Sequence, residues 1–153
     1  LSFSKPADAI DLIRWYLCRW EIEIFFKLLK SGCRLESIQL TGQDRFKPCI
    51  TLYMIIAWRI LNLTMIARVE PEVNCTCCFT HSEWKLIYTL CKKKKPPSKT
   101  PTLIVIIRLL AQLGGYTNRK TDKPPGITTI WRGINKMYQA SEAAEAVRLK
   151  GND

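Results

Sequence analysis

The chain has 153 residues, of which 47% are apolar and 10% aromatic, so it can build a hydrophobic core and falls outside the intrinsically disordered class. Lys and Arg outnumber Asp and Glu by 24 to 13, and a folded, aromatic-rich domain with a net charge of +11 favours a polyanionic partner, nucleic acid ahead of a membrane surface. Seven cysteines without regular spacing argue against a disulfide framework and favour reduced thiols in a cytosol.

The amino-terminal end shows no secretory signal peptide, because it lacks a basic start followed by an apolar run and a small-residue cleavage site. The chain begins at Leu1 rather than Met, and we expect it to be the carboxyl end of a longer protein. A short strand over residues 1–3 is the only β-structure that the sequence favours. The predicted fold is therefore mainly α.

A helix is predicted from Pro6 to Gly32, because proline fits the first turn of a helix and glycine its end. At about 100° per residue, five polar side chains fall within an arc of roughly 80° between apolar flanks. We call these the polar seam: Tyr16, Arg19, Glu23, Lys27 and Lys30. We expect a nearly buried helix that exposes this seam, since a solvated helix usually has a wide charged face. The seam is either a functional site or an intrahelical ion-pair ladder, because Arg19 and Lys27 each lie four residues from Glu23.

A second helix is predicted over residues 44–69, and it contains the most apolar run of the chain. Arg59 lies near its centre. Because an arginine is costly in the middle of a bilayer, we expect a core helix rather than a transmembrane span. Length and apolarity keep the membrane alternative open.

A cysteine-rich stretch follows at Cys75, Cys77, Cys78 and His81. A zinc site is one interpretation, but zinc ligands usually come as two spaced pairs, whereas Cys77 and Cys78 are adjacent. We favour small buried thiols around a loop.

Three further helices are predicted in the rest of the chain. A capping box at Thr80–Glu83 opens one through Cys91, Pro101 and Gly114 bound the next at 102–113, and the last covers about 127–150. The lysine run 92–95 either binds phosphates or is a solvated helix end. A basic loop at residues 115–126 matches no glycine-rich phosphate-binding motif. The last helix is mildly amphipathic, so it packs on its own domain or on a second subunit.

The first helix follows the spacing Tyr-x2-Arg-x3-Glu-x6-Lys at Tyr16, Arg19, Glu23 and Lys30. This pattern resembles the signature of bacterial DDE transposases in the group around insertion sequence four and transposon five. Residues 52–63, 70–84, 96–113 and 113–133 also look like that family, so the resemblance covers essentially the whole chain. It implies the helical carboxyl-terminal part of an RNase-H-like transposase, with most of the core sheet missing.

The resemblance also implies roles for the polar seam in cut-and-paste transposition, a metal-dependent form of DNA recombination. Glu23 corresponds to the third carboxylate of the DDE triad, a ligand of Mg²⁺ or Mn²⁺ in the full-length parent. Tyr16, Arg19 and Lys30 correspond to contacts with transposon-end DNA, and Lys27 ranks below them because it lies outside the signature.

The implied organisation has two parts and a macromolecular partner. Residues 1–70 would be the last helices of the catalytic core, and residues 71–153 a helical domain for dimerisation and synapsis. We expect a homodimer bound to transposon-end DNA in the bacterial cytoplasm, at the nucleoid, with neither a membrane nor a small-molecule substrate.

One departure from the family decides what the chain can do alone. The two Asp of the triad should come from upstream strands, and Asp8 and Asp11 lie on the same helix as Glu23 and do not replace them. We therefore expect this chain to be inactive by itself and its first two helices to expose apolar faces. The alternatives are a truncated, non-enzymatic DNA-binding or dimerisation module, as a relic or an inhibitor, and a helical membrane-associated protein.

Overall fold

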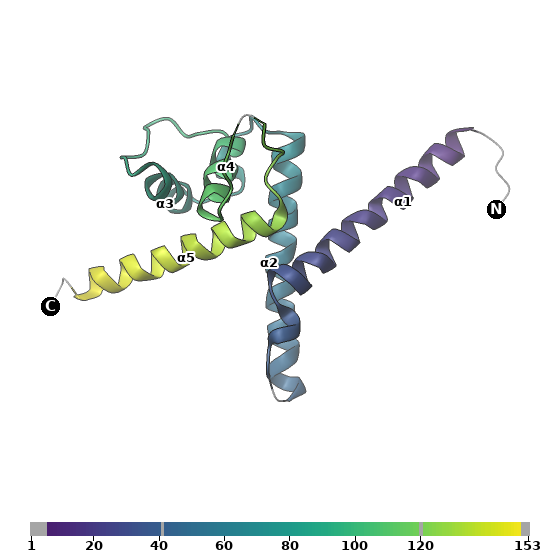
Figure 1. Ribbon diagram of the computed structural model, residues 1–153, viewed down its shortest axis with the longest axis horizontal. Coiled ribbons are helices and arrows are strands. Elements are labelled where there is room, and N and C mark those ends of the chain that lie inside the picture. The colour runs from purple at the N-terminus through teal and green to yellow at the C-terminus, as the bar shows by residue number, and fades with distance from the viewer. Residues whose placement is uncertain (1–5, 41, 120, 151–153) are drawn as a thin grey trace. The chain divides into compact units, whose positions relative to one another are not determined.

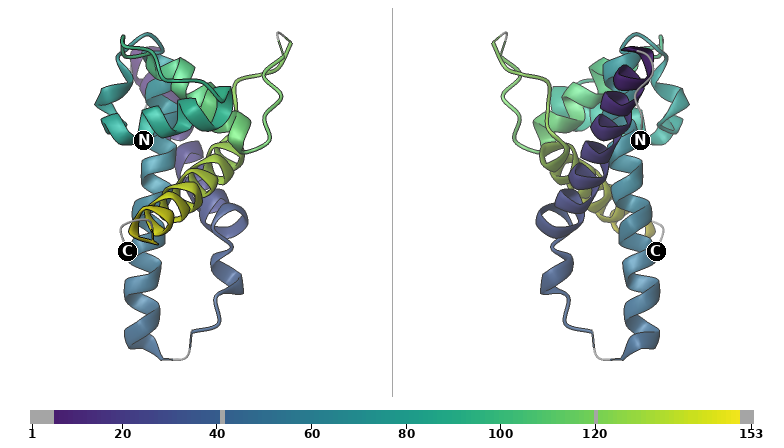
Figure 2. Two further views of the ribbon diagram at one scale, coloured as in Figure 1. Left: turned by 90° about the vertical axis from the view of Figure 1, so that its left-hand side faces the viewer. Right: turned by 90° about the vertical axis from the view of Figure 1, so that its right-hand side faces the viewer.

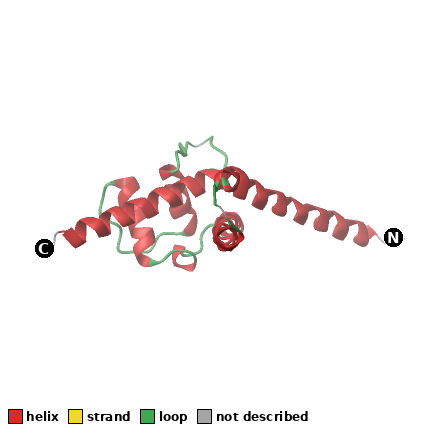
Figure 3. Cartoon of the chain, turned by 90° about the horizontal axis from the view of Figure 1, so that it is seen from below, coloured by secondary structure: helices red, strands yellow, loops and turns green. Residues whose placement is uncertain are grey.

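The computed structural model describes residues 6–40, 42–119 and 121–150, and these residues form helices and loops without a strand (Figures 1 and 3). The predicted mainly α fold is confirmed, and the strand expected at residues 1–3 lies outside the described residues. The chain divides into two compact units, residues 1–58, here the amino-terminal unit, and residues 59–153, here the helical domain. The expected boundary near residue 70, between a catalytic core and a terminal domain, stays a prediction.

The amino-terminal unit begins with α1, Pro6–Lys27, which continues directly into a π-helical turn, Leu28–Gly32. In that turn the N–H of Cys33 donates to the carbonyl of Leu28 at 2.9 Å, a bond that spans five residues instead of the four of an α-helix. The predicted end of the helix at Gly32 is confirmed. A short 3-10 helix, Leu35–Ser37, follows, and Gly42 with φ +98° precedes α2.

The apolar side chains of α1 are largely exposed, contrary to the nearly buried helix that the periodicity predicts. Trp15 is 76% exposed and Trp20 61%, whereas burial begins only at Leu28 and Leu29 beyond the end of α1. The physical reason is that the apolar flanks of the seam do not find enough packing partners among the described residues. The expected exposure of apolar faces in this chain is confirmed.

The α2 helix, Gln43–Val69, runs through the boundary between the two units. Length and composition alone would let it cross a membrane, with a mean hydropathy of 1.7 in its apolar window. In its carboxyl-terminal half, however, Ile60, Leu63, Thr64 and Ala67 recur every three to four residues and are all at least 95% buried. This half is a core helix of the helical domain, as predicted. The other half is not: only 22% of the apolar window is buried, and Leu52, Ile55 and Trp58 are exposed.

The helical domain also contains α3 (His81–Lys92), α4 (Leu103–Leu113) and α5 (Ile127–Lys150), in good agreement with the predicted ranges. A short 3-10 helix, Cys75–Cys77, lies where a loop was predicted. The predicted capping box is present, because Thr80 Oγ1 accepts from the N–H of Glu83 at 3.2 Å while Glu83 Oε2 accepts from the N–H of Thr80 at 2.8 Å. Figure 2 shows α3, α4 and the first part of α5 gathered in one cluster. Its buried core includes Trp84, Ile87, Ile106, Leu110, Ile130 and Met137.

Two glycines let α4 and α5 pack so closely that the backbones of the two helices are in contact. A methyl group at Gly133, on α5, would overlap the carbonyl group of Leu110 on α4. A methyl group at Gly114, at the end of α4, would overlap the carbonyl of Thr129 on α5. These positions have no room for a larger residue, so glycine fixes the contact between the two helices.

Candidate functional site

The polar seam of α1 is solvent-accessible and contains one of the predicted ion pairs. Arg19 Nη2 lies 3.2 Å from Glu23 Oε1, and the Arg19 guanidinium also stacks over the Tyr16 ring at 5.3 Å from its centroid. The side chains of Arg19 and Glu23 are 64% and 53% exposed. The intrahelical pair is therefore present, and its exposure leaves both groups available to a partner.

The carboxyl-terminal end of the polar seam departs from the helical register that the sequence predicts. Lys30 lies in the π-helical turn, where the wider winding interrupts the 100° step that aligned it with Glu23, and its Nζ lies 3.5 Å from Glu36 Oε1. Lys27 is exposed at the last position of α1, and Glu23 contacts Arg19 rather than Lys27 among the described residues. The seam thus contains four predicted residues on α1 and a fifth, Lys30, offset from them.

The seam by itself does not fit a divalent metal. Mg²⁺ needs near-octahedral oxygen coordination, and Glu23 supplies one carboxylate, already paired with Arg19. Over the described ranges, three His, Cys, Asp or Glu side chains never converge closely enough to hold an ion. Any metal chemistry at Glu23 would require carboxylates from another part of the protein.

The residues considered for zinc are also not arranged as a metal site in the described structure. Cys75 is buried, Cys77 is exposed and Cys78 is half-buried. His81 Nδ1 accepts a hydrogen bond from Trp84 Nε1 at 3.3 Å, so this ring nitrogen is already paired with the indole. The Sγ atoms of Cys77 and Cys78 lie 3.4 Å apart.

A cluster of polar side chains joins α2, α3 and α5 of the helical domain. The sequence did not predict this cluster. Arg59 Nη2 donates to Glu83 Oε1 at 2.9 Å, Arg59 Nη1 donates to the Tyr138 hydroxyl at 2.8 Å, and that hydroxyl donates to Glu83 Oε1 at 3.3 Å. The side chain of Arg59 is 38% exposed and that of Glu83 18%. An arginine within an apolar helix needs a polar partner, so Arg59 itself indicated that such a cluster exists. The spacing of residues in the sequence could not identify the partner.

The electrostatics of Glu83 follow from this cluster. Burial alone would raise the pKa of its carboxyl, but the hydrogen bonds from the Thr80 backbone and the Arg59 guanidinium outweigh burial and lower it. Glu83 is thus both the third residue of the capping box and the counter-ion of Arg59.

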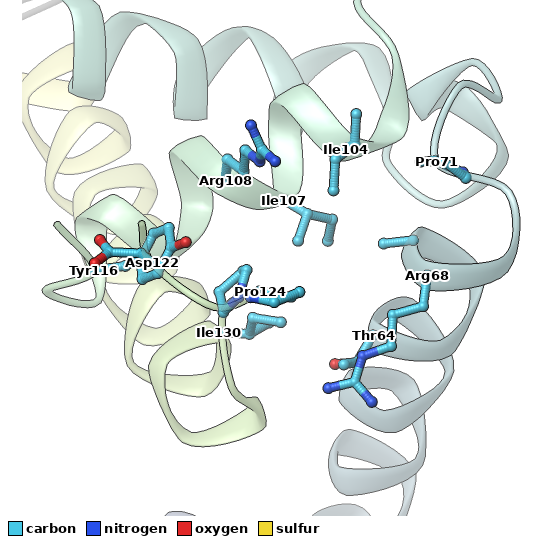
Figure 4. Close-up of a pocket in the computed structure, with 12 residues that line it drawn as sticks. Thr64, Arg68, Pro71, Ile104, Ile107, Arg108, Tyr116, Asp122, Pro124 and Ile130 are labelled. Carbon is cyan, nitrogen blue, oxygen red and sulfur yellow. The ribbon is translucent and has the colours of Figure 1, made fainter. Parts of the chain in front are cut away.

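A pocket of about 350 Å³ lies elsewhere in the helical domain, lined by α2, α4, the start of α5 and the basic loop (Figure 4). Its walls are mostly apolar, with Ile104, Ile107 and Pro125 among them. Arg68 from α2 and Arg108 from α4 contribute the two guanidinium groups at its edges. Asp122 from the basic loop also lines the pocket, so its charged groups include a carboxylate as well as two guanidinium groups.

The carboxyl-terminal half of α5 extends beyond α3 and α4 (Figure 1). From residue 142 to residue 149 every side chain is exposed, and the sequence there places small apolar residues on one face at Ala140, Ala143, Ala144 and Val147. The lysines 92–95 are exposed as well, at and beyond the end of α3. These surfaces are open to macromolecular partners.

Comparison with known families identifies the second of the two units. The model of the family described as the transposase Tn5 dimerisation domain matches residues 55–152, which is well over half of the 153 residues. The match begins in the middle of α2 and includes α3, α4 and α5. The described residues in this range form a mainly helical fold, as expected for the carboxyl-terminal region of a Tn5-like transposase. The chain belongs to the transposase Tn5 dimerisation domain family.

Proposed function

We propose that this chain is the carboxyl-terminal part of a cut-and-paste DNA transposase, in which the helical domain pairs two copies and the polar seam of α1 contacts transposon-end DNA. The observation that carries the proposal is the presence, in one chain, of the Tn5 dimerisation domain at residues 55–152 and of the Tyr16, Arg19, Glu23 and Lys30 spacing upstream of it.

The tail of α5 is the surface that best suits self-association. An isolated helix of this length is marginal in water, so a helical tail that is exposed among the described residues gains stability when a second copy covers its apolar face. Val147 is 72% exposed and continues the stripe formed by Ala140, Ala143 and Ala144. Two such stripes can pack closely because alanine allows a short interhelical distance.

The dimerisation test compares two single substitutions on the same tail. Val147→Asp places a charge in the stripe, whereas Leu149→Asp places the same charge on the opposite face at the same exposure of 72%. Sedimentation equilibrium should give a mass twice 17.7 kDa for the parent chain and the Leu149→Asp variant, and a monomer for Val147→Asp. A dimer that resists Val147→Asp, or equal effects of both variants, would exclude this face.

The charges of the seam favour a phosphate backbone over a structural ion pair. An exposed ion pair such as Arg19–Glu23 is worth about 0.2–1 kcal/mol, so a phosphate can compete for Arg19 at little cost. Lys30 is held equally loosely by Glu36, with both side chains at least 66% exposed. Arg19 can fork onto phosphate oxygens, Lys30 and Lys27 act as point charges, and the Tyr16 hydroxyl can donate.

The DNA test uses fluorescence anisotropy on a labelled duplex at several salt concentrations. Removing two phosphate contacts with Arg19→Ala and Lys30→Ala should lower the salt slope by about 1.8, at about 0.9 per contact. The matched control is Arg14→Ala with Lys47→Ala, which removes the same charge from α1 and α2 outside the signature. If the control loses as much affinity as the test variant, DNA binding depends on net charge and the assigned contacts are wrong.

Glu23 is proposed as one carboxylate of a DDE triad whose two Asp lie outside this chain. Mg²⁺ or Mn²⁺ bound by the complete triad would activate the attacking oxygen and stabilise the leaving oxygen of phosphoryl transfer. Glu23 supplies only one of those ligands, so the 153-residue chain should neither nick nor join transposon-end DNA in the presence of either ion. Strand cleavage that disappears in a Glu23→Gln variant would overturn the proposal that the chain is inactive alone.

A second candidate function is inhibition of a full-length transposase by pairing with it. The family match to a dimerisation domain favours it, because a partner that pairs but lacks a complete triad would occupy one position of a synaptic dimer. Adding this chain to the full-length enzyme should then reduce transposition in proportion to its excess, and the Val147→Asp variant should not.

A further inference from the structure

The adjacent cysteines Cys77 and Cys78 lie at the junction between the 3-10 helix and the amino-terminal end of α3. Their Sγ atoms are 3.4 Å apart; Cys77 is exposed and Cys78 half-buried. We propose that this vicinal dithiol is a binding site for a monosubstituted trivalent arsenical, whose arsenic atom bridges the two sulfurs.

The sulfur separation fits a pyramidal centre better than a tetrahedral one. A centre bonded to both sulfurs at about 2.3 Å, the length of a metal–thiolate bond, would subtend an angle of about 95° when the sulfurs are 3.4 Å apart. Tetrahedral zinc needs about 109° and four ligands. Trivalent arsenic is pyramidal with angles near a right angle, so the two sulfurs already have the spacing that it requires.

The site supplies two ligands, which also matches this chemistry. In the described part of the chain, groups of three His, Cys, Asp or Glu side chains suitable for a metal ion are absent. A monosubstituted arsenical brings its own third substituent and needs two thiols. The loop around Cys77 and Cys78 therefore completes the coordination of arsenic but not that of zinc.

A disulfide between the two cysteines is less favoured by the geometry. Neighbouring Cα atoms are about 3.8 Å apart across a trans peptide, below the roughly 4.4–6.8 Å range of disulfides, and the sulfurs would have to close to about 2.05 Å. Burial together with the neighbouring Cys77 thiol raises the pKa of Cys78 to about 11, which keeps Cys78 protonated near neutral pH. A protonated thiol is a poor partner for disulfide formation, because the thiolate is the form that attacks.

The reaction with phenylarsine oxide is a condensation without oxidation or reduction. Two arsenic–sulfur bonds form as the arsenic–oxygen bonds break. The two thiol protons leave with the oxygen as one water molecule. Because the sulfurs are already near bonding distance of a common atom, we expect the adduct to form with little change in the circular dichroism of the domain.

The test treats the reduced 153-residue chain with phenylarsine oxide and follows adduct mass, free thiols and circular dichroism. One arsenical should bind and titratable thiols should fall from seven to five, with peptide mapping placing the adduct on the segment that contains Cys77 and Cys78. A dithiol should release it, whereas a monothiol such as glutathione should not. Each of Cys77→Ser and Cys78→Ser should weaken binding about 100-fold, because the second bond is then no longer intramolecular.

Cys18→Ser is the matched control, since Cys18 is an exposed lone thiol on α1. It should bind phenylarsine oxide as tightly as the parent chain. Release of the parent adduct by glutathione, unchanged binding in Cys77→Ser, or mapping to another cysteine would each overturn the proposal. The test contains no DNA and does not depend on oligomeric state, so it is independent of the transposase proposal.

Discussion

Replacing Arg59 by methionine tests whether the ion pair between Arg59 and Glu83 stabilises the helical domain. The substitution keeps an apolar stem of similar length within α2 and removes the cation that lies 2.9 Å from Glu83 Oε1. Glu83 would retain the Tyr138 hydroxyl at 3.3 Å and the Thr80 backbone as hydrogen-bond partners. Its carboxylate would then be only 18% exposed and without a counter-ion.

The expected loss of stability lies between two limits. Breaking a fully buried pair costs about 3–5 kcal/mol, and an exposed pair contributes about 0.2–1 kcal/mol. Because Arg59 is 38% exposed, water screens the pair, and we expect Arg59→Met to lower the free energy of unfolding by about 2 kcal/mol. Glu83→Gln should cost less, since the amide oxygen can still accept from the Thr80 N–H and keep the capping box.

A double-mutant cycle with urea unfolding, followed by far-ultraviolet circular dichroism, isolates the pairwise energy. Arg59→Met, Glu83→Gln and the double variant should give a coupling of about 1 kcal/mol near neutral pH. Additivity within about 0.3–0.5 kcal/mol would refute the assignment, because it would mean that the two side chains contribute independently.

The same pair predicts an acid dependence with a defined sign. The pKa of Glu83 is lowered in the folded chain by the Thr80 and Arg59 hydrogen bonds, which together outweigh the effect of burial. A depressed carboxyl pKa stabilises the folded state above the unfolded value, and this stability is lost as the pH falls through the folded value. The Glu83→Gln variant should therefore lose less stability on acidification than the parent chain.

Two further substitutions test the packing and the capping of the helical domain. Gly133→Ala should destabilise the domain by about 3 kcal/mol or more, because the added methyl overlaps the Leu110 carbonyl. Gly126→Ala is the control and should not destabilise it, since a methyl there meets nothing within 4 Å. Equal melting curves for the two variants would contradict the close approach of α4 and α5. Thr80→Ala should lower the free energy of unfolding by about 1 kcal/mol, because it removes the acceptor that caps α3. Thr89→Ala, at an exposed position within the same helix, should be neutral or stabilising. Thermal unfolding of both variants tests this difference.

The sequence determined the helices of this protein because their boundary signals are local. The Thr80–Glu83 capping box, the glycine at 114 and the periodic apolar positions of α4 each act over a few residues, so spacing alone located α3 and α4 to within one residue or so of their observed ends. The Tyr16, Arg19 and Glu23 spacing likewise placed three polar side chains on one side of α1, where Arg19 contacts both others.

Tertiary structure alone decided which distant residues meet and which surfaces stay open. Arg59 contacts Glu83 and Tyr138 from 24 and 79 residues away, and no periodicity within one helix contains that information. The exposure of α1 depends on which partners are within reach, since an apolar flank predicts burial only if another element covers it. The π-helical turn that offsets Lys30 was likewise not predicted by the periodicity, and it contains Leu28 and Leu29, both nearly fully buried.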